Sequence, residues 1–304
     1  MQTPDWHGVI PAVLTHFNED FSINYEATLE HIEFQIEKGI HGLVTMGTCG
    51  ENNTLEEDEK KEVLAKIYAH VNGRIPVIVG VSELSTQKAV RFAKAAEPIC
   101  DGFMVLPPMS YTSDIHETVA YYQAVADAAP SIPILVYNCP AAYRVDMDIP
   151  MLREMSKIEN VVAVKEATGD ARRITDLYNE FGDRFLLLTG LDDIALESFM
   201  LGAKGWVSGL GVAFPEEDLA IWELSQQGRY KEALEIYRWY MPLLHFDTVP
   251  KLVHLMKLTS KAMGLNNGIC RPPRLSMQGA ELEEHQAMID KAIATRIDLS
   301  KYNL

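Results

Sequence analysis

Short, continuous runs of apolar residues recur along the chain. Each run is rich in Val, Ile and Leu and ends near Gly, Pro, Thr or Asn. Unbroken apolar runs of this length are typical of parallel strands covered on both faces, whereas half-exposed strands alternate polar and apolar residues. The sequence therefore predicts eight buried strands, which begin near Gly8, Gly42, Pro76, Gly102, Pro133, Val161, Phe185 and Gly205.

Segments with the spacing of amphipathic helices separate these runs. In residues 54–71, for example, Val63 and Ile67 belong to one apolar stripe. Thr54 and Glu57 have the spacing of a capping box, which predicts the start of this helix. The same reasoning predicts further helices at residues 85–97, 113–129, 148–157, 171–181, 192–201, 216–226, 229–245, 248–263 and 279–294.

Strands and helices alternate up to about residue 215, and only helices follow. Eight such repeats favour an α/β fold, a closed (β/α)8 TIM barrel with a C-terminal helical extension. We place the barrel at about residues 1–226 and the extension at about residues 227–304, in a single catalytic domain of residues 1–304. The rival fold is an open doubly wound sheet. It is disfavoured because the first run ends in AVLTHFNED, without a glycine-rich dinucleotide loop.

Composition and charge narrow the possible functions. The chain is 47% hydrophobic and 23% charged, which is ordinary for a soluble globular protein, and its formal net charge is −16. This negative field disfavours binding to nucleic acid or to anionic membranes. The four cysteines lack metal-binding spacing, which predicts reduced thiols in the cytoplasm and no metal site. We also expect no signal peptide and no transmembrane segment.

A lysine stands within the sixth apolar run, VVAVKEAT. Burial disfavours the ammonium form of Lys165 and lowers its pKa, and a neutral lysine is the usual nucleophile in Schiff-base chemistry. The alternative is that Lys165 reaches towards solvent or pairs with Glu166. Tyr137 ends the fifth run and, as a neighbour on the adjacent strand, can face the same cavity. Its phenol is a candidate proton relay, the alternative being a core tyrosine.

Other strand ends supply further candidates, because active sites of such barrels lie at the carboxyl ends of the strands. The turn GTCGE offers the hydroxyl of Thr48 and the backbone N–H of Cys49, which together suit a carboxylate. The alternative is a tight turn that only requires glycine. Gly190 and Gly209 leave room for a substrate near the backbone, or serve packing alone.

Several polar residues receive structural roles instead. Asp192 and Asp193 are expected to cap a helix, and Arg172 and Arg173 to lie on a solvated helix face. Cys139, like Cys49, is either reactive at the rim of the pocket or a small packing residue, and we favour packing.

These motifs together resemble the dihydrodipicolinate synthase/N-acetylneuraminate lyase family of Schiff-base-forming barrels, which act on 2-oxo acids. The likeness covers about residues 6–300 and rests on the GxxGE turn, the YNxP end of the fifth run and VKEATGD. It implies no cofactor, a small-molecule substrate and a homotetramer built from dimers. It assigns roles to six residues, namely Lys165 as Schiff-base lysine, Tyr137 as proton relay, Thr48 and Cys49 as carboxylate ligands, and Gly190 and Val207 as pocket lining.

Two positions depart from the synthase branch of this family. That branch has a tyrosine at the position of Met109, which reaches into a neighbouring subunit. It also has an arginine at the position of Ala142, which grips a second substrate carboxylate. Arg144 is displaced by two positions and is not its equivalent.

Several segments resemble another branch, which acts on 1-pyrroline-4-hydroxy-2-carboxylate in hydroxyproline degradation. They include YNCPAAYRVD, GWVSGLGVAFP and RPPRLSMQGAE. This resemblance implies a deaminase that yields 2-oxoglutarate semialdehyde and ammonia. The alternatives are a dihydrodipicolinate synthase-like enzyme, or an aldolase or dehydratase of N-acetylneuraminate or of a 2-keto-3-deoxy sugar acid. From another class, the alternative is a non-catalytic sensor of 2-oxo acids, which a ligand would stabilise without any product forming.

Overall fold

The computed structural model describes residues 3–108 and 111–304, so Met109 lies outside the described residues. Eight parallel strands form a curled sheet in the order β1-β8-β7-β6-β5-β4-β3-β2. Backbone hydrogen bonds from Val13 N to Val44 O and from Val44 N to Pro11 O, both 2.9 Å, join the two ends. The strands are β1 (Gly8–Val9), β2 (Leu43–Thr45), β3 (Val77–Val81), β4 (Gly102–Val105), β5 (Ile134–Asn138), β6 (Val161–Glu166), β7 (Leu186–Thr189) and β8 (Gly205–Trp206).

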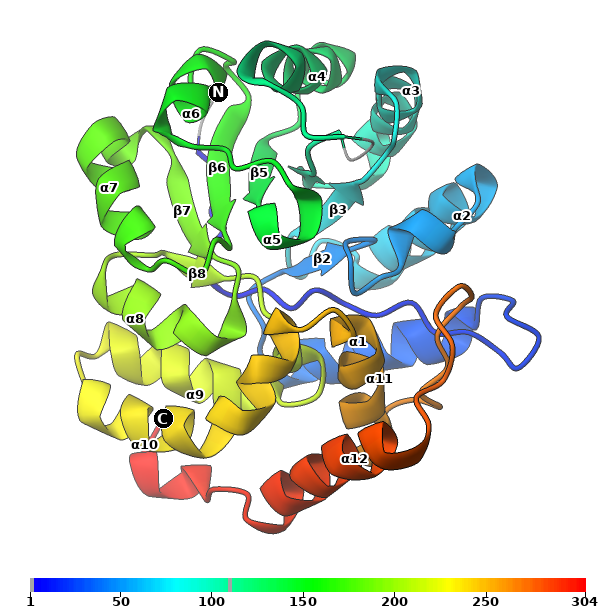
Figure 1. Cartoon of the computed structure of the whole chain (residues 1–304), viewed down its shortest axis with the longest axis vertical. Coiled ribbons are helices and arrows are strands. Elements are labelled where there is room, and N and C mark those ends of the chain that lie inside the picture. The colour runs from blue at the N-terminus through cyan, green and yellow to red at the C-terminus, as the bar shows by residue number, and fades with distance from the viewer. Residues whose placement is uncertain (1–2, 109–110) are drawn as a thin grey trace.

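Helices connect successive strands and surround the sheet, as Figure 1 shows. Because helices cover the outer face and side chains fill the inside, the strands are apolar and buried on both faces. The predicted barrel is thus confirmed. The surrounding helices are α1 (Tyr25–Lys38), α2 (Glu57–Val71), α3 (Thr86–Ala96), α4 (Ile115–Ala128), α5 (Pro140–Tyr143), α6 (Ile149–Met155), α7 (Arg172–Phe181), α8 (Ala195–Met200) and α9 (Pro215–Gln226).

Three helices follow the barrel: α10 (Tyr230–Leu244), α11 (Leu252–Ala262) and α12 (Gly279–Ala294). In Figure 1 they run from yellow to red and gather on one side of the barrel, beside α1 and α9. α10 packs on α9 and on α12, and α11 packs on α12. Between α10 and α11 lies a short 3-10 helix, η6 (His245–Thr248). Within the described parts of the chain, no helix is long and apolar enough to cross a membrane.

Two local features differ from the sequence predictions. Helix α1 is not among the predicted helices, although the side chain of Asn24 caps its start by accepting a hydrogen bond from Ala27 N at 2.9 Å. The capping box predicted at Thr54 is wrong, because the Thr54 hydroxyl donates to the carbonyl of Glu51 and cannot open the helix. Glu56 and Glu59 form the capping box of α2 instead.

Candidate functional site

A cavity of about 630 Å³ opens at the carboxyl ends of the strands. Its walls come from the turn after β2, the ends of β5 and β6, the loops after β7 and β8, and the segment between α10 and α11. Active sites of barrels of this kind lie at this end. Five of the six predicted site residues line the cavity, namely Thr48, Cys49, Tyr137, Lys165 and Val207.

Lys165 is held inside the barrel with only 5% of its surface exposed. Strands β5 and β6 pair with Tyr137 directly opposite Lys165, so the expected register is confirmed. The Nζ atom of Lys165 lies 3.9 Å from the centroid of the Tyr137 ring. Burial lowers the pKa of Lys165, while the negative charge of the nearby Asp247 opposes this decrease. Burial also raises the pKa of Tyr137 well above its ordinary value, which keeps the phenol neutral.

Glu166 takes no part in this cavity. Successive side chains of a strand point to opposite faces, so Glu166 faces away from Lys165 and accepts a hydrogen bond from Asn138 Nδ2 at 3.1 Å. The Nε atom of Arg173 lies 3.6 Å from the Glu166 carboxylate. The alternative in which Lys165 pairs with Glu166 is therefore wrong. The solvated position predicted for Arg173 is also wrong, whereas Arg172 is exposed as predicted.

The sixth predicted residue, Gly190, lies behind the lysine and does not line the cavity. A Cβ atom at position 190 would lie 2.5 Å from Cε and 2.7 Å from Cγ of Lys165. It would also lie 3.1 Å from the Cβ of Ala167. Gly190 therefore makes room for the lysine side chain, a different task from the one that the sequence assigned to it.

Gly190→Ala is expected to reduce turnover by roughly 10²-fold, because the new methyl group displaces the Lys165 amine by about 1 Å or more. The fold is expected to survive, since the lysine side chain can move. Steady-state kinetics and circular dichroism check both expectations. Gly42→Ala is the matched control, because a Cβ there makes only ordinary contacts, the closest at 3.4 Å to Pro76 O. Equal kinetics for Gly190→Ala and Gly42→Ala would contradict this account.

Tyr143 is a cavity residue that the sequence analysis missed. It ends the short helix α5, and its hydroxyl is hydrogen-bonded to the hydroxyl of Thr48. Its ring packs edge-on against the Tyr137 ring, with 5.5 Å between the centroids. Burial raises the pKa of Tyr143, so it remains a neutral donor. The sequence offered no signal for Tyr143, because a four-residue helix has no measurable apolar period.

Tyr143→Phe is expected to lower kcat/KM by about three- to tenfold, the effect of losing one buried neutral hydrogen bond. Without that bond the Thr48 hydroxyl loses its fixed orientation towards the cavity. Tyr178→Phe removes a phenol from a half-exposed ring on α7 and serves as control. Kinetics of Tyr143→Phe that match those of Tyr178→Phe would show that the bond to Thr48 has no role in the site.

Asp192 does not cap a helix, contrary to the prediction. It is fully buried, and its carboxylate accepts hydrogen bonds from Trp206 Nε1 at 2.8 Å, Leu210 N at 2.8 Å and Gly209 N at 3.0 Å. These donors come from β8 and the loop after it, so Asp192 fastens the loop after β7 to that strand. Asp193 instead contacts His245, with 2.9 Å between Oδ2 and Nδ1.

The thiols of the cavity are poor nucleophiles. Burial raises the pKa of Cys49 to about 12 and also raises the pKa of Cys139, so both remain protonated at neutral pH. This favours the packing role over a reactive one. The described residues contain no group of three or more His, Cys, Asp or Glu side chains that could hold a metal ion.

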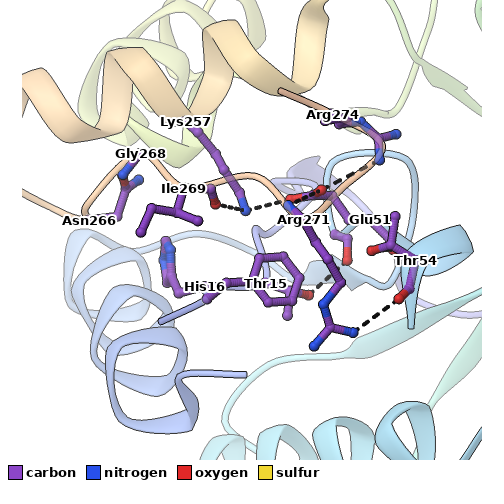
Figure 2. A network of polar contacts seen from close by, with 12 residues as sticks. Thr15, His16, Glu51, Thr54, Lys257, Asn266, Gly268, Ile269, Arg271 and Arg274 are labelled. Atoms are coloured by element: carbon purple, nitrogen blue, oxygen red, sulfur yellow. Dashed lines mark hydrogen bonds and ion pairs between the residues drawn. The ribbon is translucent and has the colours of Figure 1, made fainter. Parts of the chain in front are cut away.

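The turn that carries Thr48 and Cys49 is anchored to the C-terminal part of the chain through Glu51, whose contacts with Lys257 and Arg274 are drawn in Figure 2. Glu51 ends this turn, and its carboxylate lies 2.5 Å from Nζ of Lys257 on α11, with both side chains fully buried. Lys257 also donates to Ile269 O at 2.6 Å. The second oxygen of Glu51 lies 3.4 Å from Nη1 of Arg274, which lines the cavity. The network therefore places a cation at the cavity wall and fixes the turn.

The site thus offers a partly desolvated amine, neutral phenols and a guanidinium in one cavity. This set suits a small anionic carbonyl compound, because the amine can attack carbon while hydroxyl groups and the cation hold a carboxylate. Strand β1 is followed by no glycine-rich loop of the kind that binds dinucleotides.

Comparison with known proteins agrees with this chemistry. Residues 5–292 match the Dihydrodipicolinate synthetase family. A 4-hydroxy-tetrahydrodipicolinate synthase of Archaeoglobus fulgidus is 32% identical over 97% of this chain and 99% of its own. Dihydrodipicolinate synthase of Bacillus anthracis is 25% identical with a TM-score of 0.90, covering 97% of this chain and 99% of that one. The dihydrodipicolinate synthase of Acinetobacter baumannii, in complex with pyruvate, is 26% identical with a TM-score of 0.87, covering 94% of this chain and 98% of that one. The chain therefore belongs to the dihydrodipicolinate synthetase family, an enzyme family of the Schiff-base aldolase class.

Proposed function

We propose that Lys165 forms a Schiff base with C2 of a small 2-oxo acid or cyclic imino acid, and that the natural substrate is 1-pyrroline-4-hydroxy-2-carboxylate. The observation that carries the proposal is the buried Lys165 amine, of lowered pKa, 3.9 Å from the ring of Tyr137 in a cavity. Thr48 and Cys49 hold the substrate carboxylate. The lysine imine is itself the electron sink of the reaction.

The first half of the reaction transfers the substrate to the enzyme. Neutral Lys165 adds to C2, and the bond between C2 and the ring nitrogen breaks, which leaves a primary amine on C5. The new protonated imine makes the C3 hydrogen acidic. Tyr137 takes part in removing this proton, because its phenol lies on the adjacent strand at the same height as Lys165.

The second half removes water and ammonia. The C4 hydroxyl leaves as water when the enamine electrons form a C3–C4 double bond. A proton shift from C5 to C3 then gives an enamine across C4 and C5, and a second shift from its nitrogen to C4 gives an imine at C5. Water hydrolyses this imine to an aldehyde and ammonia. A second water releases Lys165 and leaves the 2-oxo group. One water is lost and two are consumed, so the products are 2-oxoglutarate semialdehyde and ammonia.

Two observations at the cavity wall bear on the substrate. Ala142 lines the cavity at the position where the synthase branch carries its carboxylate-binding arginine, which favours a substrate with a single carboxylate. Arg144 does not substitute for it, because among the described residues it is exposed and is not part of the cavity wall. Arg274 does reach the wall, however, and supports a second candidate, condensation of pyruvate with aspartate semialdehyde. The names of the relatives favour this second candidate.

Product identity separates the two candidates. The enzyme is supplied with 1-pyrroline-4-hydroxy-2-carboxylate in one assay, and with pyruvate plus aspartate semialdehyde in another. Release of ammonia and an aldehyde in the first assay is the expected result. Consumption of pyruvate only in the second would replace the proposed substrate by that of the synthases. Release of pyruvate from a sugar acid would point to an aldolase, and stabilisation without any product to a sensor.

Three further expectations stay predictions. They are the homotetramer built from dimers, the location in the cytoplasm and the single catalytic domain of residues 1–304. Analytical ultracentrifugation of the full chain tests the first of them.

A further inference from the structure

Two carboxyl groups meet on one side of the reactive lysine. Asp247 lies in η6 and lines the cavity together with Lys165. Its Oδ2 accepts a hydrogen bond from the backbone N of Asp192 at 3.4 Å. A Cβ atom placed on Gly209 would lie 2.9 Å from Asp247 Oδ1 and 3.2 Å from Asp192 Oδ2, so both carboxyl groups converge above this glycine.

The position of this pair relative to the strands is informative. Asp192 follows β7 and Gly209 follows β8, whereas Tyr137 belongs to β5. Strand β6, which carries Lys165, lies between β5 and β7 in the sheet. A substrate bound to Lys165 therefore has the phenol of Tyr137 on one side and a carboxyl group on the other.

The surroundings of the two carboxyl groups decide which of them carries a proton. Asp192 is held as a carboxylate by donors from Trp206, Gly209 and Leu210. For Asp247, the described residues supply the one hydrogen bond from Asp192 N. Two buried carboxyl groups that converge on one point resist ionising together, and the proton is expected on Asp247, which has fewer hydrogen-bond donors.

The charged groups near Asp247 also favour a protonated Asp247 beside an ionised Asp192. Burial and the negative charge of Asp192 raise the pKa of Asp247 well above its ordinary value, Asp193 adds to the increase, and Lys165 opposes it. Burial raises the pKa of Asp192 to about 6, and its backbone hydrogen bonds limit that increase. Across the cavity Asp247 faces the neutral groups Cys49, Cys139 and Tyr137.

We propose that Asp247 is a catalytic general acid, which protonates the oxygen that leaves while the substrate is attached to Lys165. With a 2-oxo acid, attack by Lys165 gives a carbinolamine at C2. Its hydroxyl takes the proton of Asp247, the C2–O bond breaks, and the nitrogen lone pair forms the C=N bond. Water leaves, and the carboxylate of Asp247 becomes the counter-ion of the iminium. Asp247 regains the proton when water later hydrolyses the iminium.

Asp247 can also act as general acid in the proposed deamination, and this part of its role rests on the proposed function. In the enamine derived from 1-pyrroline-4-hydroxy-2-carboxylate, Asp247 protonates the C4 hydroxyl. The enamine electrons then form the C3–C4 double bond as water departs. Tyr137 relays the C3 proton on one side by passing on its own phenolic proton as it accepts another, and Asp247 supplies a proton to the leaving oxygen on the other side.

The test uses pyruvate as the probe, so that it does not depend on the natural substrate. Full-length enzyme is mixed with pyruvate, and borohydride added at timed intervals traps the imine, which mass spectrometry counts on Lys165. The rate of imine formation by Asp247→Asn is expected to be about 10²-fold below that of the parent. Asp290→Asn, which alters an exposed carboxylate on α12, is expected to match the parent.

The pH profile separates an acid from a structural residue. The parent rate is expected to fall as the pH rises through the raised pKa of Asp247, because the acid form is then lost. Asp247→Asn should lack this alkaline decrease, and Asp247→Glu should retain it. A parent rate without the decrease, or an Asp247→Asn rate equal to the parent, overturns the proposal. The proposal is also overturned if Asp247→Asn forms the imine slowly but its rate still decreases at alkaline pH, because the decrease then belongs to another group. If the parent itself forms no adduct with pyruvate, the proposed Schiff-base function is wrong, and the role proposed for Asp247 is wrong as a consequence.

Discussion

Lys165→Ala is expected to abolish turnover, with a loss of roughly 10⁶-fold or more, the lower end of enzymatic rate enhancements. No other amine is available to replace it, because Arg274, the second cation among the described cavity residues, carries a guanidinium that stays protonated. The barrel is expected to keep its fold, since β6 pairs with β5 and β7 through backbone groups that this substitution leaves in place. Ammonia release measures the loss of turnover, and borohydride trapping with pyruvate measures the loss of Schiff-base formation.

Lys157→Ala is the appropriate control for this experiment. Lys157 is exposed and its ammonium pairs with Glu154 at the surface, so both assays should give the parent result. An adduct that still forms in Lys165→Ala would place the nucleophile at another residue. Turnover without any adduct in the parent would remove the Schiff base from the reaction altogether.

Glu51→Gln is expected to lower the free energy of unfolding by about 3–5 kcal/mol, the usual cost of leaving one partner of a buried ion pair alone. Among the described residues, the ammonium of Lys257 would keep its contacts with the carbonyl of Ile269 and with the face of the Phe17 ring, 4.4 Å away. The backbone N of Arg271 would also lose its charged acceptor. Urea denaturation followed by circular dichroism gives the change in stability.

Two companion variants identify the origin of this loss. Glu57→Gln removes a carboxylate that pairs with Lys61 on an exposed face of α2, and it should leave the denaturation midpoint nearly unchanged. Glu51→Gln combined with Lys257→Met removes both fully buried charges, and should recover part of the stability because the buried ammonium no longer lacks its carboxylate. A double variant as unstable as Glu51→Gln alone would assign the loss to the turn and not to the ion pair.

The strands and the central pair of the site were predictable because both follow from local pattern. Continuous apolar runs separated by amphipathic helices leave few ways to cover a parallel sheet. A barrel then fixes the height of each strand relative to the next, which places Tyr137 opposite Lys165. The turn with Thr48 and Cys49 followed from its place at a strand end.

The remaining residues were not predictable, because their positions depend on contacts across the sequence. Asp247 and Arg274 reach the cavity only through the packing of the C-terminal helices, which no local pattern describes. Tyr143 reaches Thr48 only because α5 folds back over the strand ends. For Asp192 a local pattern was misleading. Aspartate is a common helix-capping residue, but here its carboxylate accepts hydrogen bonds from three donors in β8 and the loop after it.

The anchoring of the Glu51 turn by Lys257 has a consequence for the order in which the enzyme matures on the ribosome. Lys165 and Tyr137 emerge well before Asp247, Lys257 and Arg274. Until those later residues dock, the cavity lacks the part of its wall that Asp247 and Arg274 supply, and the turn with Thr48 and Cys49 lacks its anchor. The complete site is therefore expected to form late in synthesis, after the C-terminal helices have packed against the barrel.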